Sequence, residues 1–163
     1  GCSGELRIRR IGPPPSLTTL DQLVVSEDAT ELYRFDPYGR HLQTLDALTG
    51  LAELDAARIA YAGFSLGTIL GVPFCADDAR IKAAALAIGG GGIGPVASDP
   101  VGHIPRLAPR PVLFVNASRD ETVPRENAEA LHEAARSPKE VLWFDCTHSE
   151  LPGVALKAMF RFL

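Results

Sequence analysis

The sequence predicts an α/β protein with a mostly parallel sheet and helices on both faces. Short, nearly continuous apolar runs alternate with longer helix-like segments from about residue 58 to the end. This alternation is typical of parallel βαβ units, and strands that are apolar throughout are typical of a sheet covered on both faces. A length of 163 residues fits one domain. We therefore expect a single domain over 1–163, with an atypical short N-terminal part over 1–57 and a regular half over 58–163.

Four strands and three helices are expected in the regular half. Glycine, proline or charged residues bound each apolar run and give the strands ordinary lengths. The predicted strands are 58–64, 83–88, 111–116 and 140–144. The predicted helices are 66–75, 125–136 and 154–163. Pro73 should end or kink the first helix. The Ala-rich run 83–88 also fits a helix, but four glycines stop it at strand length.

The N-terminal part is less regular. Residues 6–11 and 32–35 fit strands, and residues 21–32 fit a helix. Apolar residues recur at helical spacing over 42–54, which favours an amphipathic helix.

Composition and charge exclude several classes of protein. A net charge of -4 without a run of Lys or Arg argues against a surface for nucleic acid or anionic membranes. No apolar stretch approaches the ~20 residues that a membrane span needs. Three cysteines, without histidines at metal-ligand spacing, predict reduced thiols in a cytoplasmic protein and no metal. Cys2, directly after Gly1, leaves open the processed end of a bacterial lipoprotein.

The pentapeptide GFSLG at 63–67 matches the pattern G-x-S-x-G. A predicted strand ends before Ser65 and a predicted helix begins after it, so the serine should adopt a strained conformation with its Oγ exposed. Side chains at 63 and 67 would collide in such a turn, hence the glycines. The start of the helix directs free N–H groups, including that of Leu66, to a point where they can stabilise an oxyanion.

A serine nucleophile needs a base, and the chain offers four histidines. His148 follows the strand 140–144 and so lies at the carboxyl edge of the predicted sheet, where parallel α/β sheets bind ligands. The alternative for His148 is a solvated surface histidine. His132 falls within a predicted helix and is expected at the surface. His41 and His103 are expected to be structural or solvated.

The base needs a carboxylate to orient it. Asp120 follows the strand 111–116 at the same edge of the sheet, and Glu121 is the runner-up. Asp145 fits a solvated loop acid. The chain order Ser65, Asp120, His148 is the order of α/β hydrolases.

Three segments resemble one group of enzymes. LDAARIAYAGFSLGT, RPVLFVNASRDETVP and FDCTHSELP are similar to the serine, acid and histidine motifs of α/β-hydrolase-fold enzymes. The resemblance is to the compact bacterial branch of dienelactone-hydrolase-like, acetyl-esterase-like and prolyl-oligopeptidase-like members. It implies that residues 58–163 are the catalytic half of a minimal α/β-hydrolase-like domain without a lid. It also implies a catalytic triad of Ser65, Asp120 and His148, with the Leu66 N–H as one oxyanion-hole donor and no cofactor.

The sequence departs from this branch in three respects. It contains no His-Gly pair to supply a second oxyanion donor, and only about 57 residues precede the strand before the serine. The N-terminal half is therefore either shortened or incomplete. Thr68 stands where many members have a small Gly or Ala.

The leading hypothesis is a serine esterase that cleaves small carboxylic esters through an acyl-enzyme. The Gly/Pro-rich connection between 88 and 111 is too short for a lid, so an open site is expected. A peptidase or acyltransferase on the same triad is one alternative. Another is a truncated, non-catalytic module for binding or oligomerisation, in which an open sheet edge would pair two chains into a homodimer.

Overall fold

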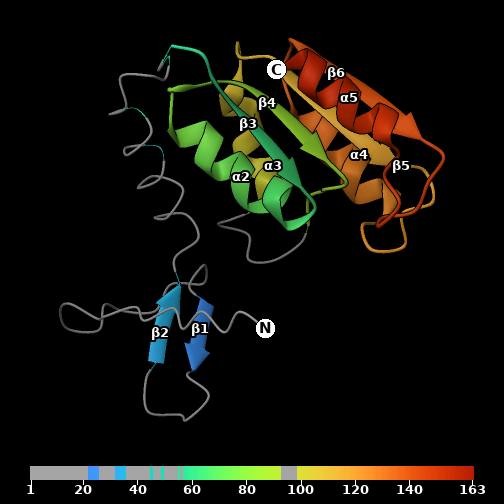
Figure 1. The fold of residues 1–163 in the computed structure, drawn as a ribbon, viewed down its shortest axis with the longest axis horizontal. Coiled ribbons are helices and arrows are strands. Elements are labelled where there is room, and N and C mark those ends of the chain that lie inside the picture. Colours follow the sequence, from blue (N-terminus) through green and yellow to red (C-terminus); the bar gives the residue numbers. More distant parts are fainter. Residues whose placement is uncertain are drawn as a thin grey trace, which may run out of the picture.

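A four-stranded parallel sheet forms the centre of the protein. The computed structural model describes residues 22–25, 32–35, 45, 49, 55, 57–92 and 99–163. The strands lie side by side in the order β3-β4-β5-β6, and each neighbouring pair is parallel. Their bounds are β3 (Ile59–Phe64), β4 (Ile81–Ala87), β5 (Val112–Ala117) and β6 (Lys139–Phe144). Figure 1 shows the carboxyl ends of these strands on the same side of the molecule.

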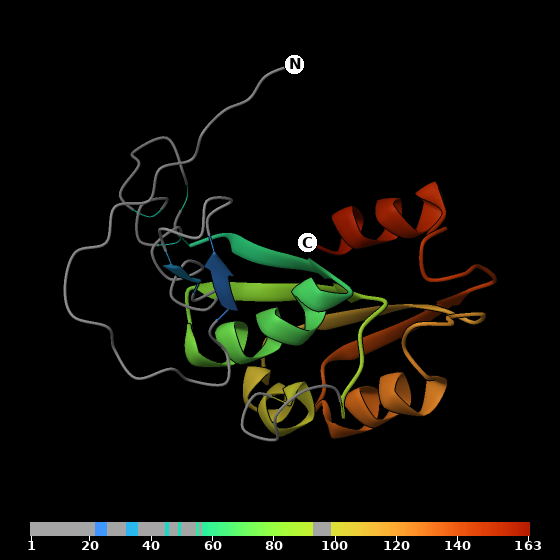
Figure 2. The same ribbon diagram turned by 90° about the horizontal axis from the view of Figure 1, so that it is seen from below.

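Helices cover both faces of this sheet. Helix α2 (Leu66–Asp77), α3 (Pro100–His103) and α4 (Arg125–Ala134) lie on one face, and α5 (Gly153–Phe162) lies on the other (Figure 2). A single 3-10 turn, η2 (Ile104–Leu107), follows α3. The predicted α/β class and its helices on both faces are therefore confirmed. None of the described helices is long and apolar enough to cross a bilayer.

Alternate residues of the central strands supply two separate cores. On β5, Val112 and Phe114 belong to the core under α2 and α4, whereas Leu113 and Val115 belong to the core under α5. This alternation follows from the period of two in a β-strand. Because both faces are buried, all six residues of β5 are buried, which explains why PVLFVN is the clearest strand in the sequence.

The strands and helices expected in the regular half are confirmed, with ends that differ by one or two residues. Pro73 does not end the helix as one of the two expectations had it, because α2 continues through it to Asp77. Pro73 cannot donate a backbone hydrogen bond within the helix. Its neighbours Val72 and Phe74 are buried in the core, and this packing outweighs the missing bond. The Asp78 N–H still bonds to the Phe74 carbonyl and closes the last turn.

The connection between β4 and β5 is more ordered than expected. Residues 100–107 form α3 and η2 instead of an irregular loop. The Asp99 side chain accepts a hydrogen bond from the Val101 N–H and so caps α3. Prolines at the first turn of each short helix also favour helix initiation, because their fixed φ suits that position.

The N-terminal part contains an antiparallel strand pair, β1 (Gln22–Val25) and β2 (Leu32–Phe35). The strand expected at 32–35 is confirmed, whereas the helix expected over 21–32 is wrong. Pairing with β2 and the β-branched residues of QLVV favour a strand here. Of the helix expected over 42–54, Leu45 and Thr49 are described and both are helical. The strand expected at 6–11 lies outside the described residues.

Substitution of Gly71 tests how tightly α2 packs on β3. A Cβ at Gly71 would lie 2.3 Å from the Tyr61 ring, and the Tyr61 hydroxyl is fixed by donating to the Gly67 carbonyl at 2.8 Å. We expect Gly71→Ala to lower the free energy of unfolding by roughly 1–3 kcal/mol, because overpacking outweighs a helix-propensity gain of about 1 kcal/mol. Urea unfolding measures the change.

Gly153→Ala is the matched control for this prediction, since Gly153 is also helical and a Cβ there meets nothing within 4 Å. It should be neutral or slightly stabilising. A Gly71→Ala protein as stable as the wild type would show that the Tyr61 ring moves aside freely.

Candidate active site

A one-residue turn at Ser65 joins β3 to α2. The strand ends at Phe64 and the helix begins at Leu66. Ser65 has φ 49° and ψ −114°, a strained conformation for a residue with a Cβ. Its N–H donates to the Ala87 carbonyl of β4 at 2.9 Å, which ties the turn to the neighbouring strand. The strained serine predicted from GFSLG is therefore present.

The two glycines of the motif differ in their surroundings. A Cβ at Gly63 would lie 2.8 Å from both the Gly67 carbonyl oxygen and the Tyr61 ring, so only glycine fits there. At Gly67, the nearest described atom to such a Cβ is the Tyr61 hydroxyl at 4.0 Å. The expected crowding therefore holds at Gly63 but not, within the described residues, at Gly67.

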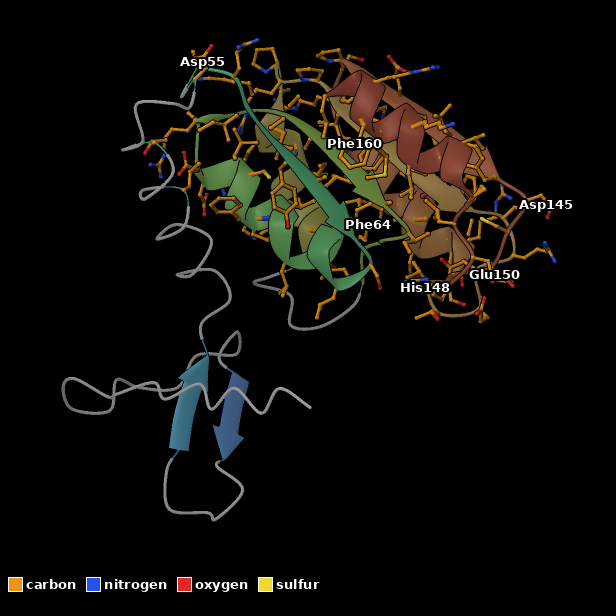
Figure 3. The ribbon with its side chains drawn as sticks, viewed as in Figure 1. Asp55, Phe64, Asp145, His148, Glu150 and Phe160 are labelled. Atoms are coloured by element: carbon orange, nitrogen blue, oxygen red, sulfur yellow. The ribbon has the colours of Figure 1, made fainter. Side chains whose placement is uncertain are left out.

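A continuous chain of hydrogen bonds links Ser65, His148 and Asp120. The distance from Ser65 Oγ to His148 Nε2 is 2.8 Å. His148 Nδ1 lies 2.9 Å from Asp120 Oδ1 and 2.8 Å from Oδ2. His148 lies 83 positions after Ser65 and 28 positions after Asp120 in the chain, yet all three residues follow the carboxyl ends of strands. Figure 3 shows Phe64 at the end of β3 and His148 in the loop that precedes α5.

The partners of His148 assign the protons in this chain. An ionised carboxylate can only accept, so Asp120 accepts from the N–H at Nδ1. Nε2 is then left unprotonated and accepts the hydrogen of the Ser65 hydroxyl. This is the tautomer that a general base requires, since it can take the serine proton when Oγ attacks.

The turn after β5 orients the Asp120 carboxylate. Asp120 Oδ1 accepts hydrogen bonds from the backbone N–H groups of Thr122 at 2.9 Å and Val123 at 2.8 Å. The Asp120 side chain is 8% exposed and that of His148 is 16% exposed. Backbone donors and little water therefore surround the carboxylate, so its orientation toward the imidazole is rigid.

The other two acids considered from the sequence have different partners. Glu121 Oε2 accepts from the backbone N–H of His148 at 3.2 Å, so it contacts the histidine loop but not the ring. Asp145 forms an ion pair with Arg119 at 2.8 Å, and its side chain is 85% exposed. Neither carboxylate contacts a ring nitrogen of His148.

His132 is buried, which contradicts its expected surface position. It is 7% exposed, and its Nε2 lies 3.2 Å from Asn116 Oδ1. The rings of Phe114 and Trp143 pack against it. Burial lowers the pKa of His132 to about 4, and the nearby positive charge of Lys139 makes a smaller contribution in the same direction. His103 lies in α3 with its Nδ1 3.4 Å from Arg106, and His41 lies outside the described residues.

The backbone N–H of Leu66 has a position suited to an oxyanion. It is the first N–H of α2, and no described residue accepts a hydrogen bond from it. The positive end of the helix dipole adds to its effect on a negative charge. The sequence lacks the His-Gly pair that supplies a second donor in similar enzymes, and no second donor is identified among the described residues.

The two described cysteines are not suited to act as nucleophiles. Cys75 and Cys146 are free and buried. Burial raises the pKa of the Cys75 thiol to about 12, which keeps it protonated. In the described part of the chain, no three His, Cys, Asp or Glu residues cluster as metal ligands would.

Comparison with known proteins finds solved structures that have a similar fold. No family model matches the sequence, and no curated protein does. Among solved structures, the chain is similar to a zinc-bound cold-adapted esterase from an Arctic intertidal metagenomic library, with a TM-score of 0.62 and 24% identity over 77% of this chain. An acetyl xylan esterase from Paenibacillus sp. R4 has a TM-score of 0.67 and 24% identity over 77% of this chain. A puromycin-hydrolysing peptidase from Mycobacterium tuberculosis has a TM-score of 0.66 and 20% identity over 76% of this chain.

These similarities show that the chain has the fold of the α/β hydrolases, as its sequence motifs predicted. The match covers 58% of the metagenomic esterase, 50% of the acetyl xylan esterase and 24% of the peptidase. The chain thus spans less than two thirds of the length of these proteins.

The buried His132 should make stability depend on pH. Its pKa in the folded state is about 4, below the ordinary value of 6.5. As the pH falls from about 6.5 to about 4, the unfolded chain binds a proton that the folded chain does not, so the free energy of unfolding decreases. His132→Gln should remove this component while keeping a donor toward Asn116.

Urea unfolding of both proteins at about pH 7 and about pH 5 isolates the effect of His132. Between these two pH values, the free energy of unfolding should fall more for the wild type than for His132→Gln. Equal losses would mean that His132 titrates normally in the folded protein.

Proposed function

We propose that this protein is a serine hydrolase that cleaves small carboxylic esters. The observation that carries the proposal is the hydrogen-bond chain from Ser65 Oγ through His148 to Asp120, with 2.8 Å between Oγ and Nε2. A strained serine whose Oγ faces His148 Nε2, and a carboxylate fixed against His148 Nδ1, together provide an activated nucleophile. Esterases among the proteins of similar fold support the ester class.

The reaction would proceed in two halves. Ser65 Oγ attacks the acyl carbon while His148 Nε2 takes the serine proton. The Leu66 N–H donates to the oxyanion of the tetrahedral intermediate. Collapse of the intermediate breaks the ester C–O bond, and His148 returns the proton to the leaving alcohol. Water then attacks the acyl-enzyme by the same steps, which releases the acid and restores Ser65.

Asp120 would act without changing its own charge. Its carboxylate stabilises the imidazolium that forms when His148 holds the serine proton, and it keeps Nε2 directed toward Ser65. The backbone N–H groups of Thr122 and Val123 bond to Asp120 Oδ1 and keep the carboxylate in place beside the imidazole. No step of this scheme draws on a metal or an organic cofactor.

A small ester is the substrate class that the surroundings of Ser65 favour. The exposed fractions of Phe64 and Leu66, on either side of the nucleophile, are 40% and 53%. An apolar, accessible border suits a short acyl group. Between β4 and β5, η2 packs into the core through Ile104 and Leu107 and α3 packs against it through Val101, so these two short helices do not form a lid over the serine.

Substitution of the nucleophile tests the proposal. The wild type should hydrolyse p-nitrophenyl acetate and butyrate, and Ser65→Ala should fall to the background rate, because it lacks the oxygen that would form the acyl-enzyme. Release of p-nitrophenol measures both. Two folded proteins that are equally inert would remove the esterase proposal and favour the non-catalytic binding module.

The neighbouring acids Asp120 and Glu121 form a matched pair. Asp120→Asn should reduce kcat by roughly 10³–10⁴-fold, because the amide favours the wrong tautomer of His148. Glu121→Gln should cost less than about tenfold, since Glu121 contacts only the backbone of the loop. Steady-state kinetics on p-nitrophenyl acetate compare them. Equal losses would contradict the separate roles of the two acids.

A peptidase on the same triad is the second candidate, and the similar fold of the puromycin-hydrolysing peptidase is the observation that favours it. Aminoacyl p-nitroanilides separate the two activities. Turnover of the anilides at a kcat/KM above that of the p-nitrophenyl esters would assign the protein to the peptidases instead.

A further inference from the structure

Thr68 is a buried polar residue beside the proposed nucleophile. It occupies the third position of α2 and is 1% exposed. The reaction scheme above gives it no part, because its side chain contacts neither His148 nor Asp120. A buried hydroxyl is costly unless it is bonded, so its partners indicate what it does.

The hydroxyl of Thr68 connects the ends of two strands. Its Oγ1 lies 2.9 Å from the Ala87 carbonyl of β4 and 3.1 Å from the Gly63 carbonyl of β3. Both groups can only accept, so the one hydroxyl hydrogen is shared between them. The Ala87 carbonyl also accepts the N–H of Ser65 at 2.9 Å. One carbonyl therefore bonds the nucleophile and Thr68 together.

The backbone of Thr68 adds a third connection. Its N–H donates to the Ser65 carbonyl at 2.9 Å. Ser65 is thus held through its carbonyl by the Thr68 N–H and through its own N–H by a carbonyl that Thr68 also bonds. The residue with φ 49° lies inside this set of bonds.

The side chain of Thr68 cannot turn away from these acceptors. Its methyl group faces Gly89, where an added Cβ would lie only 2.4 Å from Thr68 Cγ2. Thr is stiff at χ1 because of its branched Cβ. The fit of the methyl group against Gly89 therefore keeps the hydroxyl directed at Ala87 and Gly63.

From these contacts we propose that Thr68 is a positioning residue for Ser65. Its hydroxyl stabilises the strained turn so that Oγ stays at 2.8 Å from His148 Nε2. The proposal rests on the proposed esterase function for its kinetic consequence, but the bonds to the turn stand on geometry alone. Without the hydroxyl, the strain at Ser65 can relax and the nucleophile moves away from its base.

Two variants separate the hydroxyl from the bulk of Thr68. Thr68→Val keeps the branched shape and the contact with Gly89 but removes the hydrogen donor. Thr68→Ser keeps the donor and removes the methyl group. Val72→Ala is the control for stability alone, since Val72 is fully buried on the same helix, one turn further from Ser65.

Kinetics on p-nitrophenyl acetate and urea unfolding should be measured for all four proteins. For Thr68→Val we expect kcat to fall roughly 10- to 100-fold with KM within about threefold of the wild type, because a misplaced nucleophile slows chemistry but not binding. Thr68→Ser should recover most of the lost activity. Val72→Ala should lower the unfolding midpoint while keeping kcat within about threefold.

The proposal is overturned if Thr68→Val keeps the kcat of the wild type, or if Thr68→Ser loses as much activity as Thr68→Val. An inactive wild type would instead remove the esterase function. Crystal structures of the wild type and Thr68→Val then decide the positioning role by themselves. We expect a changed φ at Ser65 or a longer distance from Ser65 N to the Ala87 carbonyl in the variant; an unchanged turn contradicts the proposal.

Discussion

The strained turn at Ser65 is the constraint on which the rest of the site depends. A single residue carries the chain from β3 into α2, and this reversal leaves the side chain directed out of the sheet edge. The backbone is held there because the Ser65 N–H donates to the Ala87 carbonyl, to which the Thr68 hydroxyl also donates, and the Thr68 N–H donates to the Ser65 carbonyl. The parallel neighbours of β3 then determine what the serine meets, because their carboxyl ends emerge at the same edge. A conformation that costs about 1–3 kcal/mol is tolerated because these surroundings leave no alternative.

Hydrogen bonds continue from β5 and β6 into the loops that carry the acid and the base. Beyond the strands, the Ser118 N–H donates to the Phe144 carbonyl at 2.8 Å and the Arg119 N–H to the Cys146 carbonyl at 3.1 Å. The turn of Asp120 and the loop of His148 are therefore extensions of one strand pair. This shared backbone explains how two residues on separate loops keep a hydrogen-bond distance of 2.8 Å.

The parts of this structure that could be predicted from sequence are those encoded locally. Strand, glycine and serine stand together in GFSLG, and both the acid and the histidine follow clear apolar strands. The burial of His132 could not be predicted, because Asn116 and Trp143 come from strands outside its helix. The strand β1 could not be predicted either, because it depends on pairing with β2. The bonds of Thr68 could not be predicted because their acceptor lies at the end of β4.

If the fold activates Ser65, this serine alone should react with a reagent that other serines of the chain do not meet in an activated form. Reaction with diisopropyl fluorophosphate, followed by peptide mapping in a mass spectrometer, tests this activation most directly because the reagent needs an activated nucleophile but little substrate recognition. We expect one adduct per chain, on Ser65, which disappears when the protein is unfolded before the reaction. A folded protein that stays unlabelled, or that is labelled at a different serine, would contradict the activation of Ser65.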